Sequence, residues 1–245
     1  MGSGSAEPRS PLRGWDLGLE LADGVSAADW VVAALRPWER PGDGDGPVWV
    51  ASFVPDSYAA HARVLHPARD GRRWADLAAG TGVRIGPETG FCAVTGLDDS
   101  AANRPAWDEV VPRDGSLPAA QLAALGKALA PFTSTPQRCA FCFWIGYGYF
   151  GDQGDCELVR LPHREHFLFT GPLALTQRAF RFGVWEQSPS MWWPDDRAWF
   201  VSTDVDGYST YVGGSAACID AVLTCPGLEA IPVTPETPSD PGPCA

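Results

Sequence analysis

The sequence contains no long hydrophobic run. No segment approaches the roughly 18–20 consecutive apolar residues that a membrane-spanning helix needs, and residues 1–14 have no apolar stretch typical of a secretory signal. Basic residues are also scarce, because 18 Lys and Arg face 30 Asp and Glu, for a formal net charge of −12. The phosphates of nucleic acids and anionic lipids would repel this chain. We therefore expect a cytoplasmic protein that binds neither nucleic acid nor membrane.

Recognisable catalytic motifs are absent too. The sequence has no GxSxG nucleophile elbow, no Walker A loop and no HExxH pair. Its seven cysteines are odd in number and scattered, in a chain long enough to fold without cross-links, so we expect reduced thiols. No cofactor or metal is predicted, and the sequence leaves open whether the protein is an enzyme.

The composition indicates one globular domain. Of the 245 residues, 45% are hydrophobic and 20% are charged, which is typical of a folded protein. The ends, residues 1–13 and 234–245, are polar and rich in Ser, Gly or Pro, so we expect disordered tails. The polar segment 98–118 is expected to form a long surface loop. The predicted domain therefore spans residues 14–233.

Hydrophobic spacing and capping residues predict about four helices. They are expected at residues 27–35, 74–79, 118–130 and 215–224. Strands are predicted between and after them, at residues 48–54, 62–66, 91–94, 139–147, 156–161, 166–169, 198–205, 210–212 and 228–233. Several consecutive strands between Cys139 and Phe169 favour antiparallel pairing. The predicted fold class is therefore α+β, with a mixed, mainly antiparallel sheet.

Aromatic and acidic residues gather between residues 191 and 215. Tryptophans beside carboxylates can form a recognition surface, or they can form one side of a core. The favoured hypothesis is a binding or regulatory domain that recognises a protein or a small ligand through an acidic groove lined by tryptophan. The predicted ligand-binding residues are Trp144, Trp192, Trp193, Asp195, Arg197, Asp204, Asp206 and Tyr211.

A second hypothesis is a hydrolase or transferase. His66, held in an extended conformation by the following proline, would act as general base with Asp204 or Asp206 as its partner. A third hypothesis is a scaffold stabilised by zinc through Cys139 and Cys142. Side chains alternate along a strand, so these two cysteines should point to opposite faces, which disfavours a shared metal.

Three segments carry a resemblance to a known family. They are SPSMWWPDDRAWFVSTDVDGYSTYVGGS, TPQRCAFCFWIGYG and YAAHARVLHPA. Together they resemble an uncharacterised family of actinobacterial cytoplasmic proteins with no assigned activity, and the likeness runs from about Asp29 to Val233. The resemblance implies an intracellular single-domain α+β protein and assigns no catalytic residue.

Overall fold

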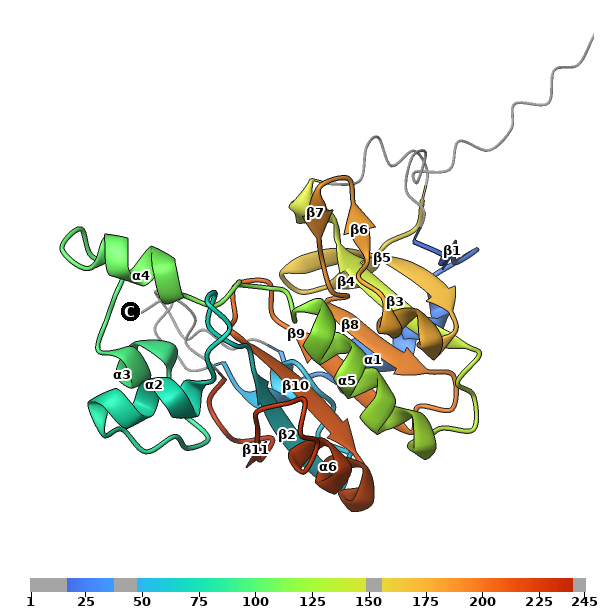
Figure 1. Ribbon diagram of the computed structural model, residues 1–245. Coiled ribbons are helices and arrows are strands. Elements are labelled where there is room, and N and C mark those ends of the chain that lie inside the picture. Colours follow the sequence, from blue (N-terminus) through green and yellow to red (C-terminus); the bar gives the residue numbers. More distant parts are fainter. Residues whose placement is uncertain (1–16, 38–47, 149–155, 240–245) are drawn as a thin grey trace, which may run out of the picture.

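The computed structural model describes residues 17–37, 48–148 and 156–239, and its α+β class agrees with the prediction (Figure 1). The described chain has six α-helices: α1 (Asp29–Ala34), α2 (Trp74–Thr81), α3 (Phe91–Thr95), α4 (Arg104–Val110), α5 (Ala119–Leu129) and α6 (Ala216–Leu223). Short 3-10 turns are η1 (Ser26–Ala28), η2 (Val50–Ser52), η3 (Ala130–Phe132), η4 (Ile145–Tyr147) and η5 (Leu173–Gln177).

Antiparallel strands form one large sheet. Its members are β1 (Glu20–Leu21), β2 (Ala60–Leu65), β3 (Cys139–Trp144), β4 (Val159–Leu161), β5 (Arg164–Gly171), β8 (Met191–Pro194), β9 (Trp199–Thr203), β10 (Ser209–Gly214) and β11 (Ala230–Val233). The order is β1-β5-β3-β8-β9-β10-β2-β11, and β4 pairs with β5. A separate hairpin joins β6 (Arg181–Phe182) to β7 (Trp185–Glu186).

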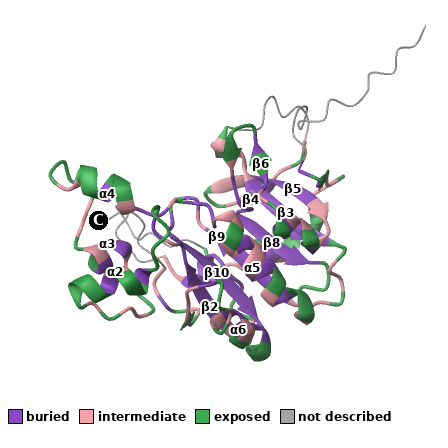
Figure 2. Cartoon of the chain, in the orientation of Figure 1, coloured by how far each residue is buried: buried purple, intermediate pink, exposed green. Residues whose placement is uncertain are grey.

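The sheet is buried on both faces. One face packs against α5, α6 and the segment before the β6–β7 hairpin, where Leu125 and Val222 meet strand residues such as Phe141. The opposite face packs against α1 and η2 through residues such as Val31 and Phe53. Figure 2 shows the central strands as almost continuously buried. Burial on both sides explains why these strands read as apolar runs.

A third cluster lies around Leu65, the last residue of β2. Helices α2, α3 and α4 pack there around Trp74, Phe91 and Trp107. Arg63 is buried here, at 1% exposure. Its Nε donates to Ser209 Oγ at 2.9 Å, and its Nη1 donates to the carbonyls of Pro87 and Thr89.

Several predicted elements differ from the observed ones. Residues 48–54, predicted as a strand, contain η2, and residues 91–94, also predicted as a strand, lie in α3. The expected loop 98–118 contains α4, and β8 occupies residues for which no strand was predicted. Residues 234–239, predicted as part of a disordered tail, pair with the start of η2, where Val50 donates to the Thr237 carbonyl. Residues 1–13 and 240–245 lie outside the described residues.

Candidate functional site

A pocket opens between the sheet and helix α1. It has a volume of about 120 Å³. Its walls come from the end of α1, from η2, from the turn between β4 and β5, and from the adjoining ends of β8 and β9. The lining residues are Val32, Leu35, Arg36, Pro37, Ser52, Phe53, Leu161, Pro162, His163, Arg164, His166, Ser190, Met191, Ser202, Thr203, Asp204 and Val205. Apolar walls with a few polar groups are typical of small-molecule sites.

Strand alternation brings the polar groups to this pocket. His166 shares its face of β5 with Leu168, which belongs to the core beneath α1. Met191 lies opposite Ser202 in the pairing of β8 with β9. Ser190, just before β8, is held by two backbone bonds, because its amide donates to Cys142 and its carbonyl accepts from Thr203. The sheet register therefore fixes the floor of the pocket.

Three buried polar atoms in this lining have no hydrogen-bond partner within the described chain. They are Ser52 Oγ, His166 Nδ1 and Ser190 Oγ. The three residues are only 5%, 2% and 2% exposed, respectively. A buried polar group without a partner costs about 1–3 kcal/mol, and such groups are rare in folded proteins. Three of them in one pocket therefore mark it as the leading candidate site.

An ion pair closes one side of the pocket. Arg164 Nη2 donates to Asp204 Oδ1 at 2.7 Å and to Asp206 Oδ2 at 2.9 Å. The guanidinium carbon of Arg164 lies 5.4 Å from the ring centroid of Trp144. Burial raises the pKa of Asp204, and the Arg164 charge opposes this shift. The charges beside the pocket are therefore engaged with one another.

His166 is neutral in this setting. Burial lowers its pKa to about 3, and the positive charge of Arg164 acts in the same direction. Both serine hydroxyls lack partners, so neither is hydrogen-bonded to His166 as a nucleophile would be to its base. The arrangement can therefore hold a ligand through hydrogen bonds but has no preformed nucleophile.

The structure does not bring the predicted tryptophan groove together. Trp192 belongs to the core under α5 and α6, whereas Trp193 belongs to the core under α1. Both are at most 2% exposed. Neighbouring residues of a strand point to opposite faces, so the pair cannot line one groove. Tyr211 is buried as well and stacks on Phe53 at a centroid distance of 5.7 Å.

The predicted acidic residues divide between two places. Asp204 lines the pocket described above, and Asp206 and Trp144 reach it only through Arg164. Asp195 lies instead at the turn between β8 and β9, where it pairs with Arg138 at 2.8 Å and both side chains are well exposed. The eight predicted ligand-binding residues therefore do not form a single site, although three of them, Trp193, Asp195 and Arg197, line a second pocket of about 510 Å³.

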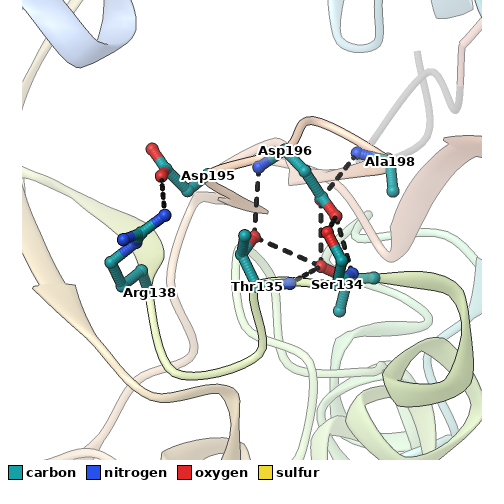
Figure 3. Close-up of polar contacts among 7 residues, drawn as sticks. Ser134, Thr135, Arg138, Asp195, Asp196 and Ala198 are labelled. Atoms are coloured by element: carbon teal, nitrogen blue, oxygen red, sulfur yellow. Dashed lines mark hydrogen bonds and ion pairs between the residues drawn. The ribbon is translucent and has the colours of Figure 1, made fainter.

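Asp196 joins the β8–β9 turn to Thr133 and Ser134 through hydrogen bonds (Figure 3). Its carboxylate accepts from the Ser134 amide at 2.7 Å, from Ser134 Oγ at 2.8 Å and from Thr133 Oγ1 at 2.9 Å. It also accepts from the amide of Ala198 at 3.2 Å. Burial acts to raise the pKa of Asp196, but these donors outweigh it and the pKa is lowered. A carboxylate with so many protein donors joins two loops and has little capacity left for a ligand.

Arg197, the remaining predicted ligand-binding residue, is held against the protein. Its backbone has a φ of 54°, in the left-handed region that residues other than glycine rarely adopt. Its guanidinium carbon lies 4.9 Å from the Trp30 ring centroid. Its carbonyl accepts from Tyr58 Oη at 3.0 Å. These contacts assign Arg197 a packing role at the turn.

His66 is buried, and within the described residues its ring nitrogens are not bonded to either predicted acidic partner. Its Nε2 lies 2.9 Å from Thr210 Oγ1, and its Nδ1 lies 3.3 Å from the Arg113 carbonyl. Burial lowers its pKa to about 4. The predicted His66–Asp couple is therefore not formed, because both ring nitrogens already have neutral partners.

The cysteines give one confirmation and one correction. Cys139 and Cys142 lie in different core clusters on opposite faces of β3, as the alternation predicted, so they cannot share a zinc ion. Within the described ranges, no group of three or more His, Cys, Asp or Glu residues is arranged to hold a metal. Cys92 is disulfide-bonded, so the expectation of reduced thiols is wrong for this residue.

Ser52, Ser190 and His166 are not among the site residues predicted from the sequence, and His166 is predicted only as the start of the strand at residues 166–169. Serine carries no pattern that separates a buried hydroxyl from a surface one. The only usable signal was the alternation in HFLF, which places His166 on a buried face.

Comparison with known proteins adds no relative: no family model, curated protein or solved structure matches this chain. The resemblance to an actinobacterial family therefore stays a prediction. Among the helices of the described ranges, none has the length and apolar character needed to cross a membrane.

Proposed function

We propose that this protein is a binding domain for a small molecule, and that the ligand occupies the pocket between α1 and the sheet. The observation that carries the proposal is the set of three partnerless polar atoms, Ser52 Oγ, His166 Nδ1 and Ser190 Oγ. A ligand that paired with them would offset a free-energy cost that folding alone leaves uncompensated. Ligand binding is also the function favoured by the sequence, but the proposed site is the pocket beside α1 instead of a tryptophan-lined groove.

Catalysis has weaker support. A hydrolase or transferase needs a nucleophile or a general base with an aligned partner. His66 is engaged with Thr210, and the pocket serines are not bonded to a histidine. The predicted cytoplasmic location remains part of the proposal, but the disulfide at Cys92 counts against it, because such bonds are rare in reducing compartments.

Met191 supplies a direct test. The chain has two methionines, Met1 and Met191, and Met191 lines the pocket. With ¹³C-methyl methionine, titration with benzamide should shift the Met191 signal saturably and leave the Met1 signal as an internal reference. Met191→Leu assigns the signal. A Met191 methyl that does not respond at millimolar benzamide contradicts the proposal.

A rim substitution separates pocket binding from adhesion elsewhere. Val32 lines the pocket and is 43% exposed, so Val32→Trp obstructs the entrance without disturbing the core. Ala33 is the next residue of α1, is also exposed and does not line the pocket. Val32→Trp should weaken benzamide binding about tenfold or more, a loss of about 1.4 kcal/mol. Ala33→Trp should leave the affinity unchanged; equal effects of both variants would place the probe outside the pocket.

A further inference from the structure

We infer that the pocket selects a small neutral molecule with an apolar body and one polar end that both donates and accepts hydrogen bonds, as a carboxamide does. The inference rests on the proposed binding function and names the class of ligand. It follows from the walls of the pocket, from the chemistry of its partnerless atoms and from the pairing of its charges.

The walls fix the body of the ligand. Leu35, Phe53 and Met191 contribute apolar surface from three separate elements. The volume of about 120 Å³ is comparable to cavities that accept a single benzene ring, about 150 Å³ in a well-known engineered case. A compact ring or branched aliphatic group therefore fits, whereas a peptide or a nucleotide is too large.

The partnerless atoms fix the polar end. Ser52 Oγ and Ser190 Oγ can each donate one hydrogen bond and accept others, and a neutral imidazole nitrogen does one or the other according to its tautomer. The three residues come from η2, from the approach to β8 and from β5, and all three line the pocket. A group with both an N–H and a C=O matches this set better than a group that only accepts.

The charges exclude an ionised ligand. Arg164 already bonds to both Asp204 and Asp206. The other basic residues of the lining, Arg36 and His163, are exposed. The guanidinium carbon of Arg36 lies 6.0 Å from the Trp49 ring centroid. An ionic ligand among Ser52, His166 and Ser190 would lose its hydration without gaining a counter-charge, which is strongly unfavourable.

Three probes that share one benzene ring test the inference: benzamide, benzoate and toluene, each titrated at pH 7.5 against the Met191 methyl signal. Benzamide should bind most tightly. Benzoate should bind at least about tenfold more weakly, because its charge stays unpaired, and toluene about tenfold more weakly, because it leaves the polar atoms without partners. Ser52→Ala and Ser190→Ala should each weaken benzamide about five- to tenfold and leave toluene unchanged.

The outcomes separate this inference from the proposed function. Benzoate binding as tightly as benzamide, in a manner blocked by Val32→Trp, overturns the neutral selectivity while the binding function stands. Equal affinities for benzamide and toluene overturn the role of the polar end. If none of the three probes moves the Met191 signal, both the inference and the proposed function are wrong.

Discussion

Ser188 and Ser190 are two residues apart and almost equally buried, at 3% and 2% exposure, but only the Ser188 hydroxyl is hydrogen-bonded within the described chain. Ser188 Oγ accepts a hydrogen bond from the Leu117 amide at 2.9 Å. Ser190 Oγ has no partner in the described chain. The two serines thus form a natural comparison between a hydroxyl that supports the fold and one that the fold leaves available.

We predict that Ser190→Ala stabilises the protein and Ser188→Ala destabilises it. Removing a partnerless buried hydroxyl should raise the free energy of unfolding by about 1 kcal/mol, because its desolvation cost disappears. Removing Ser188 Oγ leaves the Leu117 amide unpaired and should lower the free energy by about 1–3 kcal/mol. Urea unfolding at pH 7 measures both. A loss of stability in both variants would mean that Ser190 already has a partner in solution.

The second prediction concerns the charges beside the pocket. Arg164→Gln should lower the free energy of unfolding by about 2–4 kcal/mol, because Asp204, whose side chain is 20% exposed, loses its counter-charge. Asp206→Asn should cost at most about 1 kcal/mol, because that side chain is 70% exposed. In the double variant Arg164→Gln/Asp204→Asn the loss should be smaller than the sum of the single losses. Additive losses would show that the two residues are not coupled.

The third prediction concerns acid stability. The folded-state pKa values of His66 and His166 are lowered to about 4 and about 3, chiefly by burial. The unfolded chain therefore binds protons first as the pH falls below the ordinary value of about 6.5. Their stabilising contribution is complete above that value and is lost as the pH falls toward 4, at about 1.4 kcal/mol per pH unit for each histidine.

His166→Asn isolates one of these contributions. Asn does not titrate, so the slope of unfolding free energy between pH 6 and pH 5 should be smaller than in the wild type by about 1.4 kcal/mol per pH unit. Asp204 acts in the opposite sense because its pKa is raised, but it is present in both proteins and cancels in the comparison. Identical slopes would mean that His166 titrates normally in the folded state.

The fourth prediction concerns the β8–β9 turn. Asp196→Ala removes the acceptor of four hydrogen bonds from Thr133, Ser134 and Ala198 and should lower the free energy of unfolding by about 1–3 kcal/mol. Asp195→Ala breaks only the exposed pair with Arg138 and should change it by less than about 1 kcal/mol. Neither substitution should alter benzamide binding. Loss of binding in Asp196→Ala at full stability would link this turn to the site.

Sequence patterns predicted the parts of the fold that depend on local chemistry. The last helix was predicted to start at Ser215, and the Ser215 hydroxyl caps it by accepting from the Cys218 amide. Alternation correctly placed Cys139 and Cys142 on opposite faces. The apolar run 48–54 failed because periodicity does not distinguish a buried strand from a buried turn. Phe91–Thr95 failed because five residues between two glycines are too few to show a helical period.

The candidate site lay beyond sequence reasoning for a different reason. Ser52 lies more than a hundred positions before His166 and Ser190 in the sequence. Only the tertiary fold brings the three residues to one pocket. Whether a buried hydroxyl has a partner depends on its tertiary neighbours. Trp192 and Trp193 drew attention because tryptophan is common at recognition sites, but burial on both faces of the sheet gives them a core role instead.

A crystal structure of the protein with benzamide tests the central claim most directly. We predict a benzamide ring between Phe53 and Met191, with its amide within about 3.2 Å of Ser52 Oγ, Ser190 Oγ and His166 Nδ1. Benzamide bound elsewhere, or ordered water bridging these three atoms at saturating benzamide, would contradict the account.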